Sequence, residues 1–166
     1  SAMANIIVLV KQVPDTNARI VLTGDRVDLS AVKKVMSPYD EFAVETALQH
    51  RESKGGEVTA ITVGGAGADK VLKDAKAIGV DNIVRIDCDT QLDSNALQSI
   101  LASVISSLGA EVVYCGKSAA DTGAGSTGPG LAERLGWASV SNTTSVTFGE
   151  QLSVVTPSAG GNARID

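Results

Sequence analysis

The feature that most constrains the fold is an alternation of short apolar runs with helix-like segments. The run Asn5–Lys11 is apolar and contains β-branched residues, which is typical of a strand buried on both faces. Three further strands are predicted at Glu57–Gly65, Asp81–Cys88 and Ala110–Gly116. Glycine-ended segments with helical spacing lie between them. Because short links join strand to helix and helix to strand, the pattern predicts βαβ crossovers. We therefore expect an α/β, Rossmann-like, doubly wound, mainly parallel sheet with helices on both faces.

The domain organisation is expected to be simple. Residues 4–166 are predicted to form a single α/β nucleotide-binding domain, and residues 1–3 look like a cloning scar. A hairpin is expected around Gly24-Asp25, and two strands are expected around Gly149-Glu150. The last nine residues, "SAGGNARID", look like a glycine turn followed by the beginning of another strand. We therefore expect a chain that is truncated at its C-terminus.

The start and end of the first helix carry recognisable signals. Ser37 is a good N-cap, Pro38 suits the first helical position, and Asp40 completes an acidic variant of the capping box. Lys54 and the two glycines after it predict the helix end. His50 lies near that end, where an interaction with the helix dipole is the ordinary explanation for a histidine.

Composition excludes several classes of function. The net charge is −5 and no basic stripe is present, which argues against nucleic acid as the main partner. No run is long and apolar enough to span a bilayer, and a cytoplasmic protein is expected. Cys88 and Cys115 lack metal-ligand spacing and are predicted to be small buried hydrophobes. No catalytic triad, carboxylate dyad or metal cluster is apparent. This pattern favours ligand binding, or electron transfer through a cofactor, over catalysis by side chains.

The long loop from Gly116 to Gly128 is the strongest candidate for ligand binding. Ligands of open parallel sheets bind beyond the carboxyl ends of the strands, and this loop follows a predicted strand. Small residues let the backbone approach a ligand closely, and successive amides at a helix start can hold a phosphate. A mobile surface loop is the alternative interpretation. Neither the P-loop motif nor a dinucleotide fingerprint after the first strand is present.

Two polar residues of this loop have open interpretations. Lys117 could contact phosphate or a flavin edge, or it could be a solvated lysine at a strand end. Asp121 could accept from ribose hydroxyls or shape an Asx turn. The start of the first helix at Ser37 is a second candidate source of amide donors.

Several motifs occur in one order that identifies a family resemblance. The segments "VLVKQVPDT", "MSPYDEFAVETALQHRES", "EVTAITVG", "AIGVDNIVRID" and "CGKSAADTGAGSTGPGLAERLGW" together resemble the β subunit of electron transfer flavoprotein. The resemblance implies pairing with an α subunit that carries the redox FAD, and electron shuttling from flavin dehydrogenases to an acceptor. It also implies a structural AMP in this chain, or a second FAD in electron-bifurcating members. The residues implied to hold that nucleotide are Leu9, Ser37, Pro38, Tyr39, Asp40, Val63, Gly116, Lys117, Ser118, Ala119, Ala120, Asp121, Thr122, Gly123, Ala124, Gly125, Ser126 and Thr127.

The loop departs from the family pattern at three positions. Gly123 stands where Asp is common, Ala124 where Thr is common, and Ser126 where Gln is common. Backbone amides could still serve a phosphate there. The alternative function is a stand-alone ATP- or AMP-binding module similar to universal stress proteins. A small adenine-nucleotide hydrolase would need an SGGxDS-like loop after the first strand, which this sequence lacks.

Overall fold

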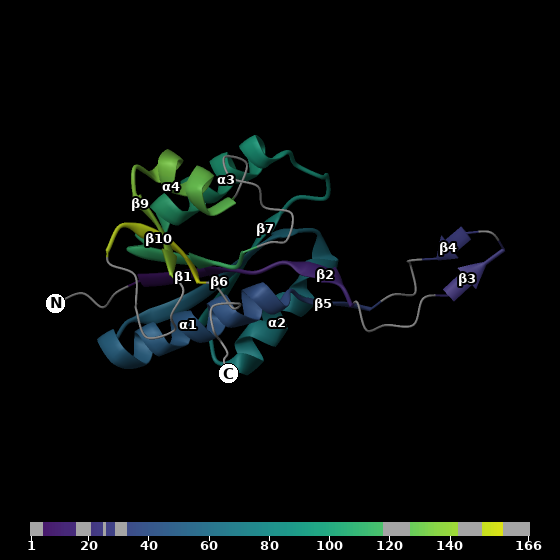
Figure 1. Cartoon of the computed structure of the whole chain (residues 1–166), viewed down its shortest axis with the longest axis horizontal. Coiled ribbons are helices and arrows are strands. Elements are labelled where there is room, and N and C mark those ends of the chain that lie inside the picture. The colour runs from purple at the N-terminus through teal and green to yellow at the C-terminus, as the bar shows by residue number, and fades with distance from the viewer. Residues whose placement is uncertain are drawn as a thin grey trace.

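The computed structural model describes residues 5–15, 21–24, 26–28, 33–117, 127–142 and 151–157 (Figure 1). In chain order its elements are β1 (Asn5–Leu9), β2 (Gln12–Pro14), β3 (Val21–Thr23), β4 (Arg26–Asp28), β5 (Lys34–Met36), α1 (Pro38–Lys54), β6 (Glu57–Gly64), a 3-10 turn (Ala66–Ala68), α2 (Asp69–Ile78), β7 (Asn82–Asp87), α3 (Ser94–Ser107), β8 (Val112–Cys115), α4 (Thr127–Leu135), β9 (Ala138–Asn142) and β10 (Ser153–Pro157).

Six of the described strands form one parallel sheet in the order β7-β6-β1-β8-β10-β9. The chain builds outward from β1 through β6 to β7, and then returns to the other side of β1 with β8. The strand order therefore reverses between β1 and β8, where Leu9 is the register partner of Cys115. This arrangement confirms the predicted α/β, doubly wound sheet. Of the two strands expected around Gly149-Glu150, β10 follows that position, whereas β9 ends at Asn142 and residues 143–150 lie outside the described residues. The sequence did not predict that β10 lies between β8 and β9.

Helices cover both faces of this sheet, with α1 and α2 on one side and α3 and α4 on the other (Figure 1). Each face has its own apolar core. In β1, Ile6 and Val8 pack toward α1 and α2, whereas Ile7 packs toward α3 and α4. All three side chains are fully buried, which explains why the strand is a continuous apolar run rather than an alternating one.

Two antiparallel pairs interrupt the path from β1 to α1. The β3–β4 hairpin, which lies away from the main sheet in Figure 1, confirms the hairpin expected around Gly24. The second pair joins β2 to β5, with Gln12 opposite Met36, and was not predicted. This β2–β5 pair brings the start of α1 back beside the end of β1.

The first turn of α1 has a different hydrogen-bond pattern from the expected capping box. The Ser37 hydroxyl oxygen accepts from the Tyr39 amide at 3.3 Å, as an N-cap should. However, the Ser37 amide donates to the Lys11 carbonyl at 3.4 Å, and the Asp40 carboxylate accepts from the Lys11 amide at 2.9 Å. The capping-box prediction is therefore wrong, because Asp40 ties the helix start to the end of β1 instead.

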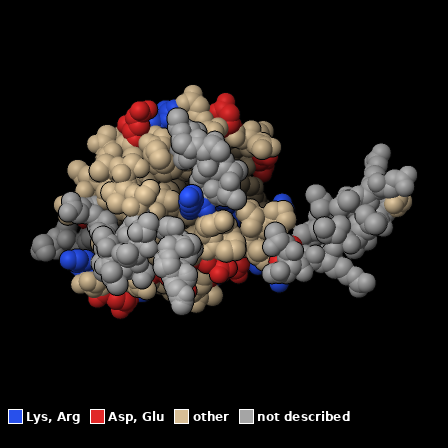
Figure 2. Space-filling model, in the orientation of Figure 1, with Lys and Arg blue, Asp and Glu red and all other residues tan. Residues whose placement is uncertain are grey.

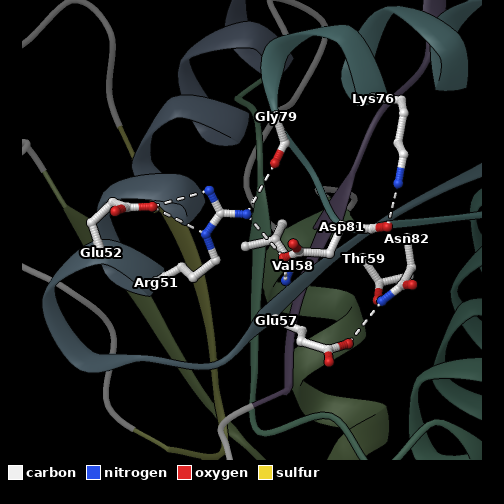
Figure 3. Close-up of polar contacts among 9 residues, drawn as sticks. All are labelled: Arg51, Glu52, Glu57, Val58, Thr59, Lys76, Gly79, Asp81 and Asn82. Carbon is white, nitrogen blue, oxygen red and sulfur yellow. Dashed lines mark hydrogen bonds and ion pairs between the residues drawn. The ribbon is translucent and has the colours of Figure 1, made fainter.

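A polar cluster fixes the opposite end of α1, as Figure 3 shows. Arg51 donates to the Gly79 carbonyl and to Asp81, each at 2.9 Å, and the Val58 amide donates to the same carboxylate at 2.9 Å. The Val58 amide and then Arg51 hold the pKa of Asp81 below its usual value. The cluster joins the last turn of α1 to the amino ends of β6 and β7. The cluster therefore lies at the opposite end of these strands from their carboxyl ends, where ligands of open parallel sheets bind.

Candidate functional site

A pocket of about 150 Å³ lies at the carboxyl edge of the sheet, where the strand order reverses. Open α/β sheets bind their ligands at this topological position. The ends of β1, β6 and β8, the first turns of α1 and α4, and one face of α3 form its wall. The described lining residues are Leu9, Val10, Lys11, Asp40, Ile61, Thr62, Val63, Leu97, Leu101, Cys115, Gly116 and Thr127.

The pocket brings together sequence-predicted residues from separate segments. Leu9, Asp40, Val63, Gly116 and Thr127 all line it, although they lie far apart along the chain. The other predicted residues of the described chain, Ser37, Pro38, Tyr39 and Lys117, are not among its described lining residues. Ser118, Ala119, Ala120, Asp121, Thr122, Gly123, Ala124, Gly125 and Ser126 lie outside the described residues.

Sequence reasoning missed the contribution of α3. Leu97 and Leu101 lie one helical turn apart and add apolar surface to the lining, together with Ile61 and Val63 of β6. The i, i+4 leucine pair was a usable signal, since the helix after an outer strand must pack back over the sheet. Lys11 also lines the pocket, at the end of β1 where the sequence places ligand-binding residues.

Asp40 and Gly116 are in close contact at the polar end of the pocket. Asp40 is only 4% exposed. A Cβ atom at position 116 would collide with the Asp40 carboxylate and would lie 2.7 Å from the Tyr39 carbonyl oxygen. Glycine is therefore required at the end of β8, because the backbone there approaches the first turn of α1 closely.

Glycine also permits the close packing of α4. A Cβ atom at Gly128 would lie 2.7 Å from the Thr156 hydroxyl oxygen and 3.3 Å from the Cys115 sulfur. The Cys115 sulfur lies 3.4 Å from that same hydroxyl. These contacts seat the first turn of α4 on β8 and β10. The amino end of this helix consequently faces the pocket, where Thr127 lines the wall.

His50 has a different environment from the one expected. Its Nδ1 atom lies 2.6 Å from the Tyr114 hydroxyl, and the two rings form an edge-to-face contact. Burial, followed by the nearby charge of Lys54, lowers the pKa of His50. His50 thus forms a buried polar pair with Tyr114 of β8, a contact that the sequence did not indicate.

Within the described part of the chain, the cysteines and charged side chains form no metal-binding group. Cys115 is buried as predicted, but Cys88 is partly exposed, because it follows the outer strand β7. No group of three His, Cys, Asp or Glu residues that could hold a metal ion occurs among the described residues.

No described helix is long and apolar enough to cross a membrane. On the face shown in Figure 2, acidic and basic side chains form small separate groups among uncharged residues.

The chain is similar to known proteins over most of its length. The electron transfer flavoprotein domain matches residues 26–165. The electron transfer flavoprotein subunit beta of Bacillus subtilis (strain 168) is 35% identical over 134 residues, covering 79% of this chain and 52% of that protein. Protein FixA of Sinorhizobium fredii is 35% identical over 139 residues, covering 79% and 49%. The subunit beta of Syntrophomonas wolfei is 32% identical over 163 residues, covering 96% and 64%. The chain thus spans about half the length of the first two relatives.

Proposed function

The chain belongs to the electron transfer flavoprotein domain family, and from this membership we propose that it is the nucleotide-binding part of a β subunit. In this proposal AMP fills the pocket in a structural role, and a second FAD is the variant occupant. The FAD of an α subunit supplies the redox chemistry. The pair carries electrons from flavin dehydrogenases to an acceptor, and this chain contributes binding rather than a catalytic side chain.

The observation that carries the proposal is the position of the pocket. It lies between the ends of β1 and β8, at the reversal of strand order, where nucleotides bind in doubly wound sheets. Five residues implied by the family resemblance converge on it. A surface loop without a binding role would not require this convergence of Leu9, Asp40, Val63, Gly116 and Thr127.

The chemistry of the wall also suits an adenylate. Aliphatic side chains from β1, β6 and α3 offer an apolar surface for a flat ring. The start of α4 offers backbone amides and the positive end of a helix dipole to a phosphate. Asp40 offers acceptor oxygens to hydroxyl or amino groups. The residues present therefore fit the nucleotide.

Identification of the bound ligand tests the proposal. The chain is purified without added nucleotide, the ligand is released by heat, and the supernatant is analysed by mass spectrometry. AMP at a near-stoichiometric level is expected, and FAD would identify the variant occupant. ATP together with homodimers would contradict the proposal and favour a universal-stress-protein-like module, and so would the absence of any nucleotide after supplementation with AMP.

A matched pair of variants ties the ligand to this pocket. Leu97→Trp adds bulk to a residue of the lining, whereas Ile78→Trp adds the same bulk to an exposed position at the end of α2. The proposal predicts that ligand content falls in the first variant and is unchanged in the second. Equal ligand content in both variants would place the nucleotide elsewhere.

The proposed partner is tested separately. A tagged copy of this chain is co-expressed with an electron transfer flavoprotein α subunit and recovered by affinity chromatography. Co-elution of the α subunit with FAD absorbance is expected. Recovery of this chain alone, while its nucleotide remains bound, would contradict the pairing and leave the nucleotide site intact.

A further inference from the structure

We propose that Gln98 is a positioning residue, which fixes the place of α4 against α3 and thereby the place of the backbone amides at the start of α4. In this inference Gln98 does not touch the ligand. The inference rests on the proposed function, because its effect is read through nucleotide binding. It goes further by assigning this role to Gln98 and Gly130, neither of which is among the described lining residues of the pocket.

Gln98 is a buried polar residue in an otherwise apolar contact between two helices. The helices α3 and α4 lie side by side over one face of the sheet (Figure 1), where Leu101 and Leu131 belong to the apolar core. The Gln98 side chain is only 7% exposed. Burial of an amide costs free energy unless hydrogen bonds compensate it, so an apolar residue would be the ordinary choice at this position. A buried polar residue between two helices can instead fix their register.

Gly130 of α4 provides the space that the Gln98 amide occupies. A Cβ atom at position 130 would collide with the terminal atoms of the Gln98 side chain. Glycine is a poor helix former, and this close approach explains why α4 contains one there. The Gln98 amide therefore lies directly against the backbone of α4, and a larger residue at position 130 must displace the amide or separate the two helices.

Arg134 adds a second contact between the same two helices. Its Nε atom donates to the Gln98 side-chain oxygen at 3.5 Å, and its guanidinium also donates to the side-chain oxygen of Asn95. Asn95 and Gln98 lie one turn apart on α3, and Arg134 lies one turn after Gly130 on α4. Apolar contacts are non-directional, whereas these hydrogen bonds have preferred directions. Together the contacts fix both the separation of the helices and their register.

The contact between Gln98 and Gly130 is close to the pocket on both helices. Leu97, the neighbour of Gln98, lines the pocket, and so does Thr127, which lies one turn before Gly130. A movement of α4 away from α3 therefore displaces the first turn of α4 relative to the apolar surface of Leu97. Hydrogen bonds to a phosphate need a separation of about 3 Å, so this movement weakens phosphate binding more than contacts with the ring.

The experiment compares two probes on variants that exchange bulk between the two helices. AMP and adenosine are each titrated calorimetrically into nucleotide-free wild-type protein, Gln98→Ala, Gly130→Ala and the double variant that carries both substitutions. Gly67→Ala is the matched control, because it adds the same methyl group where no heavy atom lies within 4 Å.

Gly130→Ala is expected to weaken AMP by about tenfold, as the loss of one hydrogen bond to a charged group does. Adenosine should stay within about twofold, because it has no phosphate, and Gly67→Ala should leave both affinities within about twofold of the wild-type values. In the double variant the missing amide leaves room for the methyl group, so AMP affinity should return to within about threefold of wild type. Equal losses of AMP and adenosine affinity would indicate a general loss of packing and would overturn the inference, and so would a double variant that binds AMP as weakly as Gly130→Ala.

Gln98→Ala covers the case in which Gly130→Ala does not fold, because it removes bulk without adding any. It is expected to weaken AMP by about fivefold and adenosine by less than about twofold, since α4 loses the contact that fixes its place. Unchanged AMP affinity in this variant would overturn the inference. If wild-type protein binds AMP but the variants bind it equally well, only the inference is wrong, whereas a failure of wild-type protein to bind AMP refutes the proposed function as well.

Discussion

Replacing Gly116 with alanine tests the close approach of β8 to α1. A Cβ atom there would lie 2.6 Å from the Tyr39 carbonyl carbon and 2.7 Å from its oxygen, inside the 3.4 Å at which ordinary contacts begin. The obstacle is backbone in the first turn of α1, which Lys11 and Ser37 hold in place. The two elements must therefore separate by several tenths of an ångström. Overpacking of this kind destabilises by about 1–3 kcal/mol.

The effect is measured by urea unfolding and by thermal unfolding of the nucleotide-free chain. Trp137 is the only tryptophan and is partly buried against α3 and α4, so its fluorescence reports on unfolding. At about 2–4 °C per kcal/mol for a chain of this size, the melting temperature should fall by roughly 2–12 °C.

Gly67→Ala is the matched control for this substitution. A Cβ atom at Gly67 meets no heavy atom within 4 Å, and its backbone has no positive φ. Its replacement should be neutral or stabilise by about 0.4–1 kcal/mol through the unfolded state. If Gly116→Ala were as stable as Gly67→Ala, the claimed tight contact between β8 and α1 would be refuted.

Two further substitutions and a pH series probe the rest of the scaffold. Tyr114→Phe removes the hydroxyl that contacts His50. It should destabilise the chain by about 1–3 kcal/mol in urea unfolding, because the buried Nδ1 atom of His50 loses this contact. An unchanged free energy of unfolding would refute the buried pair. Burial lowers the pKa of His50 below 6.5, so the unfolded chain binds the proton more tightly. Stability should therefore fall as the pH drops from 6.5 toward the folded-state pKa, and this slope should be smaller in His50→Gln. Asp81→Asn disrupts the hydrogen bonds that Figure 3 draws to this carboxylate and should lower the free energy of unfolding by about 0.5–1.5 kcal/mol. The control Asp74→Asn, which removes one partner of a surface ion pair on α2, should change that free energy by less than about 0.5 kcal/mol. Equal effects of the two substitutions would contradict the role of the cluster.

Local sequence signals predicted the elements well, because those signals act within a few residues. Ser37 does cap α1, and Gly55 and Gly79 do end α1 and α2. The apolar runs of β1, β6 and β8 became buried parallel strands, because helices cover both of their faces. The Gly24 hairpin likewise followed from a turn and its immediate neighbours.

Contacts between distant residues could not be predicted in this way. Asp40 has the right spacing for a capping box, but the β2–β5 pair brings Lys11 within its reach. His50 meets Tyr114 only after α1 packs on the sheet. Leu97 joins the pocket because α3 folds back over β6, which depends on the sheet order rather than on local pattern.

A crystal structure of the chain with AMP would test the central claim most directly. The account predicts an adenylate beyond the ends of β1 and β8, with its phosphate at the Thr127 and Gly128 amides. A phosphate held away from the start of α4, or a nucleotide bound away from the carboxyl edge of the sheet, would contradict the account.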